Sequence, residues 1–468
     1  MMWLGRTRRV HFVGIGGIGM SGIAELLVNM GYEVSGSDVR SSPVTDRLVS
    51  LGASVATGHH PDRIAGADVV VVSSAIADDN PEVLAARAVH VPVIPRAEML
   101  AELMRLRVGI AVAGAHGKTT TTSMVALMLE RAGLDPTAVI GGRLSAFGSN
   151  ARLGAGQYMV VEADESDQSF LKLSPAFAII TNIDREHLEA YGSFARLVDA
   201  FRHFADRVPF YGAVIACADD PAIAGLLPRL TRRALRYGFS DGVDVRGLDP
   251  AGDGSHARCR VRYRTFGPAQ EAGEGELALA VPGRHNLLNA LAAVTTGLEL
   301  GLTFDRIRTA LAEFRGAERR YETRGRAADV QVVDDYGHHP TEIAAVLEGV
   351  RQGPPGRIVA VFQPHRYTRT RDLLHAFGPA LAAADLVVLT DIYAAGEAPL
   401  PGVTVEALAD AIRPCVPDLH VVSDLEAVAG HVAAVARAGD VVITFGAGSI
   451  AGVGDRILEA LRRNGGGA

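Results

Sequence analysis

The chain has 468 residues, a formal net charge of −7 and three cysteines. This length exceeds what one hydrophobic core usually serves, so we expect two or three domains. The mild charge argues against a nucleic-acid-binding surface. The cysteines Cys217, Cys259 and Cys415 are odd in number and widely spaced, so they suggest neither a disulfide framework nor a zinc site, and a reducing compartment suits them best.

The N-terminus superficially resembles a signal peptide, because arginines precede an apolar stretch at Val10–Met30. Glycines and Glu25 interrupt that stretch, and no uninterrupted apolar run is long enough to span a membrane. We expect a soluble cytoplasmic protein, and the sequence is silent on its oligomeric state.

Residues 8–105 alternate short apolar runs with helix-like stretches, which is typical of βαβ units in a parallel sheet. The expected elements are strands at Val10–Ile15, Glu33–Ser37, Val69–Ser73 and Val91–Ile94, and a helix from about Met20 to Asn29.

The first turn of this region reads G-I-G-G-I-G at residues 14–19, directly after a strand, and Asp38 ends the next strand. This fingerprint places a diphosphate at a helix N-terminus and an acidic side chain near a hydroxyl-bearing group. Three interpretations remain open at this point: an NAD-type site, a site for another diphosphate nucleotide, and a structural glycine turn.

A phosphate-loop-like run, A-G-A-H-G-K-T-T-T-T, occupies residues 113–122 after the apolar segment 108–112. Its glycines allow backbone N–H groups to form an anion nest, while Lys118 offers a charge to the β and γ phosphates and Thr119 a hydroxyl to Mg²⁺. A helix expected from Thr120 to Arg131 would point its positive end at the same phosphates. Val112 stands where the usual motif has its first glycine, so the loop is shortened; the alternative is a glycine-rich turn that caps an ordinary helix.

Two groups of polar residues follow strands near this loop. A burst of carboxylates, beginning at Glu162, follows the strand around residues 157–161, where hard oxygen ligands would hold Mg²⁺ beside ATP; a solvated acidic loop is the alternative. A second strand at Ala176–Thr181 leads to His187. A lone histidine is usually structural, but its place at the mouth of a neighbouring parallel strand makes His187 a candidate metal ligand.

A helix beginning near residue 282 carries Asn286 and Asn289 one turn apart on one face. These side chains could read an adenine edge or cap the helix, and the sequence leaves both open.

Residues from about 316 onward predict a third α/β unit, with strands near Val330–Asp334, Ile358–Phe362, Leu386–Thr390, His420–Ser423 and Val441–Phe445. Two clusters follow its strands, D-D-Y-G-H-H-P at residues 334–340 and Q-P-H-R-Y-T-R-T-R at 363–371. Cationic and aromatic groups there suit a small anionic ligand, since arginine binds a carboxylate in bidentate fashion. The alternative is a basic interdomain surface.

These motifs, in this order, resemble those of the Mur ligase family: G-I-G-G-I-G-M-S-G-I-A, G-A-H-G-K-T-T-T-T, E-A-D-E-S-D-Q-S-F, H-N-L-L-N-A, D-D-Y-G-H-H-P-T-E and Q-P-H-R-Y-T-R-T-R. The resemblance covers nearly the whole chain. It implies three α/β domains: a Rossmann-like UDP-sugar-binding domain at residues 1–105, a central ATP-binding P-loop domain at 106–315, and a Rossmann-like amino-acid-binding domain at 316–468.

The resemblance further implies an ATP-dependent amide ligase of peptidoglycan precursor synthesis, with two Mg²⁺ ions. L-alanine would be joined to the lactyl carboxylate of UDP-N-acetylmuramate through an acyl phosphate. Some relatives carry a carbamylated lysine beside the second metal. Lysine occurs here only at Lys118 and Lys172, so that device is absent after His187, which agrees with the alanine-adding type.

The site residues implied by the resemblance fall into five groups. The ATP group is Gly114, Ala115, His116, Gly117, Lys118, Thr119, Thr120, Asn286, Asn289, Arg320 and Asp335. The UDP-sugar group is Gly14, Gly16, Gly17, Gly19, Asp38, Ser73 and Ser74. The amino-acid group is Tyr336, His338, His365, Arg366 and Arg369. The metal ligands are Thr119, Glu162 and His187, and the catalytic group is Lys118, Glu162, His187, His338 and Arg366.

Three rival functions remain. Within the family, a recycling ligase would join a preformed tripeptide to UDP-N-acetylmuramate. Outside it, a nicotinamide-dependent oxidoreductase could be built on the turn at Gly14, or a phosphate-loop regulatory module could bind partners without making bonds.

Overall fold

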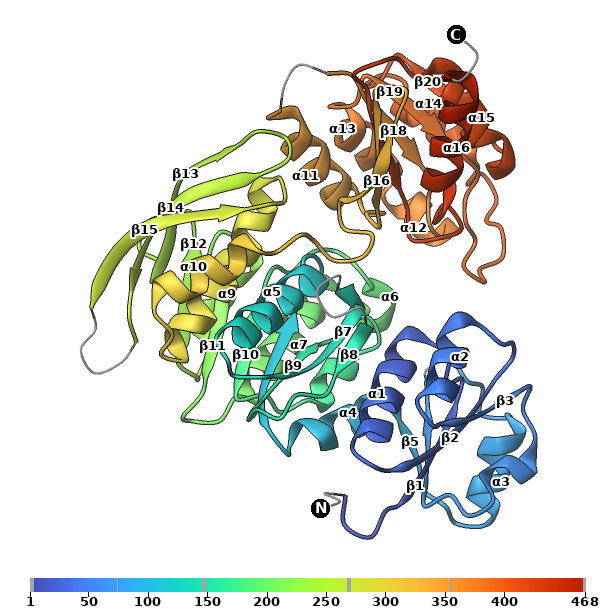
Figure 1. The fold of residues 1–468 in the computed structure, drawn as a ribbon, viewed down its shortest axis with the longest axis vertical. Coiled ribbons are helices and arrows are strands. Elements are labelled where there is room, and N and C mark those ends of the chain that lie inside the picture. The colour runs from blue at the N-terminus through green and yellow to red at the C-terminus, as the bar shows by residue number, and fades with distance from the viewer. Residues whose placement is uncertain (1–3, 74, 145–148, 267–270, 354–355, 466–468) are drawn as a thin grey trace. The chain divides into compact units, whose positions relative to one another are not determined.

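The structure of the chain is a computed structural model that describes residues 4–73, 75–144, 149–266, 271–353 and 356–465. Three separate sheets, each with its own helices, follow one another along the sequence (Figure 1). The residues pack into two compact units. One comprises residues 1–248, 260–277 and 288–314, and the other comprises residues 249–259, 278–287 and 315–468.

The first sheet is wholly parallel, with the strand order β3-β2-β1-β4-β5. Its strands are β1 (Arg9–Val13), β2 (Glu33–Asp38), β3 (Ser54–Thr57), β4 (Val69–Val72) and β5 (Val93–Pro95). Its helices are α1 (Ile18–Asn29), α2 (Pro43–Ser50), α3 (Pro81–Ala88) and α4 (Arg96–Met104), with a 3-10 turn at Pro61–Ile64. The four predicted strands and the predicted helix are confirmed to within about two residues. β3 was missed because its sequence, S-V-A-T, has partly exposed side chains and no apolar run.

The second sheet has ten strands in the order β15-β14-β13-β12-β11-β10-β6-β9-β7-β8. They are β6 (Val108–Ala113), β7 (Thr137–Leu144), β8 (Ser149–Arg152), β9 (Tyr158–Glu162), β10 (Phe177–Ile180), β11 (Ala213–Cys217), β12 (Ala234–Gly238), β13 (Val245–Gly252), β14 (Ala257–Arg264) and β15 (Ala272–Leu279). The helices are α5 (Lys118–Arg131), α6 (Leu188–Tyr191), α7 (Phe194–Asp206), α8 (Pro221–Leu226), α9 (Arg284–Glu299) and α10 (Phe304–Ala312), with 3-10 turns at Ser169–Lys172 and Leu227–Arg229.

Strand β6 lies between β9 and β10 and is parallel to both. Val112 pairs with Glu162 of β9, and Ala113 pairs with Ile180 of β10. The carboxyl ends of the three strands therefore meet at one edge of the sheet, as the sequence predicted. This edge carries the phosphate loop, the carboxylate burst and the segment that leads to His187.

The third sheet has the order β16-β17-β21-β18-β19-β20. Its strands are β16 (Glu322–Ala327), β17 (Val330–Asp335), β18 (Ile358–Phe362), β19 (Leu386–Leu389), β20 (Leu419–Val421) and β21 (Val441–Phe445). All five predicted strands are present, and β16 is an additional antiparallel edge strand that pairs with β17. Its exposed, charged sequence E-T-R-G-R-A gave no apolar signal.

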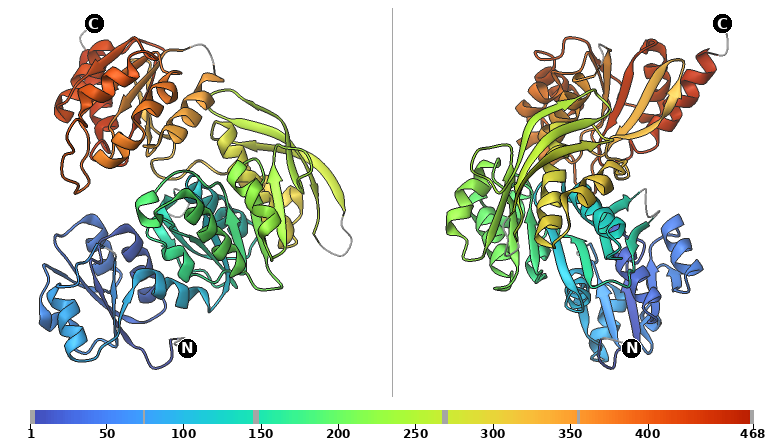
Figure 2. Two further views of the ribbon diagram at one scale, coloured as in Figure 1. Left: turned by 180° about the vertical axis from the view of Figure 1, so that it is seen from behind. Right: turned by 60° about the vertical axis from the view of Figure 1, so that its left-hand side comes forward.

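Helices cover both faces of the third sheet. They are α11 (Pro340–Arg351), α12 (Tyr367–Asp372), α13 (Phe377–Leu381), α14 (Val405–Ile412), α15 (Leu425–Val435) and α16 (Val453–Gly465), with a 3-10 turn at Leu374–Ala376. One core packs α11, α13 and α14 against the sheet, and another packs α15 and α16 against it (Figure 2, orange to red). None of the helices in the described part of the chain has the length and apolar character that a membrane span requires.

Candidate active site

The phosphate loop joins β6 to α5 through two glycines with positive φ angles, +142° at Gly114 and +78° at Gly117. A Cβ atom on Gly117 would lie 2.5 Å from Oδ1 of Asn289, and one on Gly114 would overlap the hydroxyl of Thr181. Because neither site has room for a side chain, these glycines are required by both backbone conformation and packing. The shortened loop thus forms a tight turn into the helix, as expected for an anion nest.

Lys118 is the first residue of α5, and its ammonium has three acceptors. Nζ donates to the carbonyl oxygens of Gly114 at 2.7 Å and Ala115 at 3.2 Å, and to Oε1 of Glu165 at 2.9 Å. Burial by itself would lower the pKa of Lys118, but the carboxylates of Glu165, Glu162 and Asp164 outweigh it and hold the pKa above its ordinary value. Lys118 is therefore a charged group held over the loop.

Thr119 and Glu162, the predicted ligands of one Mg²⁺, face each other. Oγ1 of Thr119 donates to Oε2 of Glu162 at 2.9 Å, and the same oxygen accepts from the N–H of Gly141 at 2.8 Å. The pair brings a hydroxyl and a carboxylate together beside the first turn of α5, as a magnesium site next to a triphosphate requires.

A second donor cluster contains His187 together with Glu165 and Glu186, whose ligand atoms all lie within 4.8 Å of one another. Glu165 is 3% exposed, and its Oε2 has no hydrogen-bond partner among the described residues. Burial, aided by Asp164 and opposed by Lys118, raises the pKa of Glu165 to about 7. Of these three residues only His187 was predicted as a metal ligand, although the position of Glu186 next to His187 just after β10 was an available signal.

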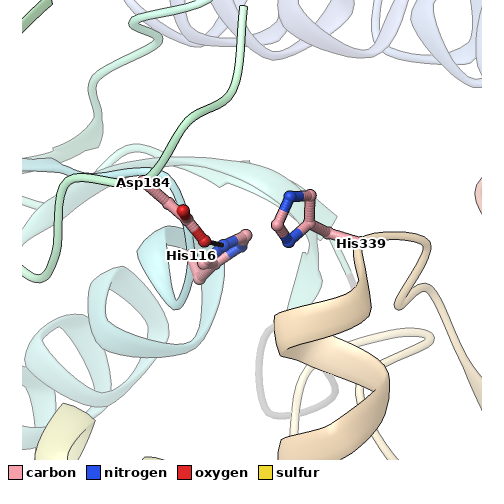
Figure 3. Close-up of side chains that lie close together, drawn as sticks. All are labelled: His116, Asp184 and His339. Carbon is pink, nitrogen blue, oxygen red and sulfur yellow. Dashed lines mark hydrogen bonds and ion pairs between the residues drawn. The ribbon is translucent and has the colours of Figure 1, made fainter. Parts of the chain in front are cut away.

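His116 of the loop is bonded to the segment after β10. Its Nε2 lies 2.9 Å from Oδ2 of Asp184 (Figure 3), and its backbone N–H donates to Oδ1 of Asn182 at 2.8 Å. Neither Asn182 nor Asp184 was assigned a role from the sequence. Figure 3 also labels His339, which precedes α11 and whose ring accepts from the N–H of Thr341 at 3.3 Å.

The two asparagines of α9 have different surroundings. Oδ1 of Asn289 accepts from Oγ1 of Thr121 at 3.2 Å and lies against Gly117, so Asn289 packs against the phosphate loop. Nδ2 of Asn286 donates to the carbonyl oxygen of Pro282 at 2.7 Å, which ties it to the turn before the helix. A role for either in binding adenine stays a prediction.

The glycine turn at residues 14–19 joins β1 to α1. Gly14 has φ +79°, and the N–H of Gly16 donates to Oδ2 of Asp38 at 2.8 Å. The Ser73 hydroxyl lies near Gly14, Gly17 precedes α1, and Ser74 is outside the described residues. The predicted residues other than Ser74 thus gather at this turn.

Arg96, at the start of α4, was missed. A Cβ atom on Gly19 would lie 3.2 Å from its Cζ, and its Nη2 donates to Oδ2 of Asp164 at 2.8 Å. A cation beside the predicted diphosphate turn is therefore bonded to the carboxylate loop that follows β9. An isolated arginine carries no motif, so only the fold identifies it.

In the third domain the residues predicted to bind the amino-acid substrate lie after the carboxyl ends of β17 and β18. The ring centroids of Tyr336 and His338 are 5.4 Å apart, and those of His338 and His365 are 5.6 Å apart. Nη1 of Arg369 lies 3.1 Å from Nδ1 of His365, and Arg366 directly follows His365. Burial, with the nearby charges of His338, Arg369 and Arg366, lowers the pKa of His365 to about 3, so its ring is neutral.

Two further residues assigned to ATP lie beside this cluster. The guanidinium of Arg320 is 5.0 Å from the ring centroid of Tyr336. Asp335 accepts from the N–H groups of Tyr321 and Gly337, both at 2.7 Å. Burial raises the pKa of Asp335 to about 6, although Arg320 and these two hydrogen bonds oppose the rise. Contact of either residue with ATP stays a prediction.

Comparison with known families accounts for nearly the whole chain. Residues 9–107 match the profile described as Mur ligase family, catalytic domain; residues 112–297 match Mur ligase middle domain; and residues 319–448 match Mur ligase, glutamate ligase domain. The chain belongs to the Mur ligase family, and its three α/β domains are those of that family.

Its similar relatives include proteins named UDP-N-acetylmuramate–L-alanine ligase. The one from Pelobacter propionicus is 50% identical over 462 residues, covering 98% of this chain and 99% of the relative. The one from an Anaeromyxobacter species is 53% identical over 459 residues, covering 97% and 98%. The solved UDP-N-acetylmuramate-alanine ligase of Thermotoga maritima has a TM-score of 0.80 at 30% identity, covering 97% of this chain and 99% of that one. A murein peptide ligase from Psychrobacter arcticus has a TM-score of 0.70 at 25% identity, covering 97% and 99%.

Proposed function

We propose that this protein is an ATP-dependent, ADP-forming ligase that joins L-alanine to the lactyl carboxylate of UDP-N-acetylmuramate, in cytoplasmic peptidoglycan precursor synthesis. The observation that carries the proposal is the edge where β6, β9 and β10 end. There, a phosphate loop with a charged Lys118 lies beside the carboxylates of Glu162 and Glu165. The proposed substrates are those in the names of the relatives that are 50% and 53% identical to this chain.

In the proposed reaction the lactyl carboxylate attacks the γ-phosphorus of ATP, which releases ADP and forms an acyl phosphate. The amine of L-alanine then attacks the acyl carbon, releasing phosphate and forming the amide. Such phosphoryl transfer depends mainly on positioning and charge neutralisation. The loop N–H groups at residues 114–120 and the Lys118 ammonium are placed to bind the phosphates, and Asn286, Asn289, Arg320 and Asp335 are assigned to the rest of ATP.

The donor groups beside the loop fit a hard divalent cation. Thr119 and Glu162 would hold one Mg²⁺, and His187, with Glu165 and Glu186, would hold a second. The fit rests on the proximity of their donor atoms and on the buried Oε2 of Glu165, which lacks a partner among the described residues. When bound, Mg²⁺ would neutralise charge on the phosphates.

We assign L-alanine to the third domain. Arg366 or Arg369 would bind its carboxylate, with Tyr336, His338 and His365 around it. A neutral His365 beside two arginines leaves the cluster positively charged, which suits an anionic group.

The UDP-sugar diphosphate is assigned to the N-terminus of α1 at residues 14–19, with Asp38, Ser73 and Ser74 near the nucleoside or sugar. We retain the domain boundaries 1–105, 106–315 and 316–468.

A phosphate-release assay tests this function. With ATP and Mg²⁺, phosphate should appear only when UDP-N-acetylmuramate and L-alanine are both present, and mass spectrometry should find their amide. Phosphate release without the amino acid, or a mixture without amide product, would contradict the proposal. Omitting each substrate in turn provides the controls.

The alternative within the family is a recycling ligase, since the Psychrobacter arcticus protein is named murein peptide ligase. The same assay with a tripeptide in place of L-alanine distinguishes the two: preference for the tripeptide would favour recycling. A nicotinamide-dependent oxidoreductase would leave Lys118, Glu162 and His187 without a role. Phosphate release that requires both UDP-N-acetylmuramate and L-alanine would exclude a regulatory module.

A further inference from the structure

The backbone of Arg366 adopts a conformation that side chains rarely tolerate. Its φ is +70° and its ψ is 140°, which combines a left-handed φ with an extended ψ, a region that glycine alone populates freely. Arg366 directly precedes α12. The strained residue is therefore itself one of the two arginines assigned to the amino-acid carboxylate. A strained residue persists only where its surroundings fix it.

The backbone contacts that fix Arg366 come from the segment after β19. The N–H of Arg366 donates to the carbonyl oxygen of Tyr393 at 2.8 Å, and the N–H of Tyr393 donates to that of Pro364 at 2.8 Å. His365 and Tyr393 form an isolated parallel β-bridge. Residues 391–397, which we term the clamp segment, are thus paired with the turn that contains Arg366.

Side chains of the clamp segment reinforce this pairing on both sides of Arg366. The ring of Tyr393 stacks on that of His365, with centroids 5.6 Å apart and planes at 21°. Gly448 lies so close behind Tyr393 that a Cβ atom there would overlap the ring. After Arg366, the carboxylate of Glu397 accepts from both the N–H of Thr368 at 3.0 Å and its hydroxyl at 2.6 Å.

We propose that the clamp segment is a positioning element of the amino-acid site, in which Tyr393 and Glu397 hold Arg366 in its strained backbone conformation. The strain fixes the direction in which the Arg366 side chain leaves the chain, and so places a guanidinium for the carboxylate of an α-amino acid. Tyr393 and Glu397 act through Arg366 and His365. The ligand assignment rests on the proposed function, whereas the strain does not.

A pair of substitutions at residue 366 tests the strain by itself. Arg366→Gly and Arg366→Ala both remove the side chain, but only glycine relieves the backbone. In most positions glycine is the less stable of the two; here we expect Arg366→Gly to melt about 2–4 °C higher than Arg366→Ala. The matched pair at Arg371, in α12, should show the ordinary order. A melting temperature for Arg366→Gly at or below that of Arg366→Ala would contradict the proposal that the clamp segment holds Arg366 in a strained conformation.

Kinetics of the full chain test the positioning role. We expect Glu397→Ala to raise the KM for L-alanine about tenfold or more while the KM for ATP stays within about twofold. Glu397→Gln, which keeps an acceptor oxygen, should fall between Glu397→Ala and the unchanged chain. Glu459→Ala, on an exposed position of α16, is the control with no expected change. Unchanged KM for L-alanine, or an equal rise in both KM values, would overturn the proposal.

The two experiments separate the inference from the function on which it rests. If the unchanged chain used another amino acid, the same KM comparison would be made with that amino acid, and the proposed substrate alone would be wrong. If the melting temperatures at residue 366 showed the ordinary order in an active enzyme, the clamp would be wrong and the function would stand.

Discussion

The side chains of Lys118 and Glu165 form a buried ion pair. Lys118 is assigned to the phosphates and Glu165 to the proposed metal site. Their Nζ and Oε1 atoms are 2.9 Å apart, and the side chains are 15% and 3% exposed. Removing Lys118 would leave the buried carboxylate of Glu165 without its cation, which is destabilising, whereas Lys118 without Glu165 would still lie near the carboxylates of Glu162 and Asp164. Glu165 also offers a donor atom to the cluster with Glu186 and His187, so this carboxylate connects the lysine assigned to the phosphates with the proposed metal site.

The metal role of Glu165 leads to a prediction for Glu165→Gln. The amide keeps the side chain's shape but lacks the negative charge that a hard cation prefers. We expect the Mg²⁺ concentration for half-maximal activity to rise about tenfold, with the KM for L-alanine unchanged. Titrating Mg²⁺ in the phosphate-release assay measures this, and Glu98→Gln, at a half-exposed surface pair, is the control. An unaltered Mg²⁺ requirement would remove Glu165 from the metal site.

Asp335 provides a prediction about pH and stability. Burial raises its pKa from 3.8 to about 6, so its ionised form is disfavoured in the folded protein. The resulting destabilisation is absent below pH 3.8, grows as pH rises, and is complete above about pH 6, where it amounts to about 3 kcal/mol. In Asp335→Asn this destabilisation is absent at every pH. The free energy of unfolding of the variant, relative to that of the unchanged chain, should therefore increase between pH 4 and 7.

Urea unfolding followed by circular dichroism at several pH values tests the Asp335 prediction. The difference between the two proteins is the informative quantity, because the other titrating groups are common to both. Parallel stability curves over that range would show that Asp335 does not titrate as proposed. The amide also loses one of the hydrogen bonds from Tyr321 and Gly337, which shifts the curve by a constant amount and leaves its slope unaffected.

At the scale of single elements, the phosphate loop was largely predictable from sequence, whereas the residues that complete the site were not. The strand before it, the helix after it and the roles of its glycines follow from local chain geometry. Arg96 and the clamp segment are brought to the predicted residues by tertiary packing, and nothing in the neighbouring sequence marks them, whereas Glu186 adjoins the predicted His187. Local patterns therefore identified the centre of the site and missed its surrounding supports.

The turn at Gly117 gives a prediction with an internal control. Gly117 and Gly301 have nearly equal φ angles, +78° and +80°, but a Cβ atom on Gly301 would meet nothing within 4 Å. Gly301→Ala should therefore lose only the left-handed backbone preference, about 1 kcal/mol, with an unchanged KM for ATP. Gly117→Ala would also displace Asn289, so we expect at least about a tenfold rise in the KM for ATP. Similar kinetics for both variants would contradict the packing argument.

At the scale of the whole molecule, three α/β domains could be predicted because each contains buried parallel strands that appear as apolar runs. The second domain was the least predictable. Its strands β13, β14 and β15 alternate buried and exposed residues or are charged, and they extend a sheet whose first strands lie far earlier in the chain. Edge strands such as β16 share this weak signal, since solvent on one side removes the need for apolar residues.

The use of lysine across the whole chain gives the last prediction. Only Lys118 and Lys172 are lysine among 46 basic residues. Nζ of Lys172 lies 3.5 Å from Oε2 of Glu98 in a half-exposed pair, which arginine can replace. Lys118 instead directs its ammonium to three acceptors at 2.7, 3.2 and 2.9 Å, matching the three donors of a compact ammonium. A planar guanidinium is larger and its donors diverge, so it cannot reproduce this geometry.

We therefore expect Lys172→Arg to keep full activity and Lys118→Arg to lower kcat/KM for ATP by about 10²–10³-fold. Steady-state kinetics measure both, while circular dichroism and calorimetric binding of UDP-N-acetylmuramate check that each variant is folded and retains its first substrate. Activity of Lys118→Arg within about threefold of the unchanged chain would mean that any cation suffices at the loop. Because both variants exchange the same two residue types in one chain, their difference isolates the geometry of the site from the charge of the molecule.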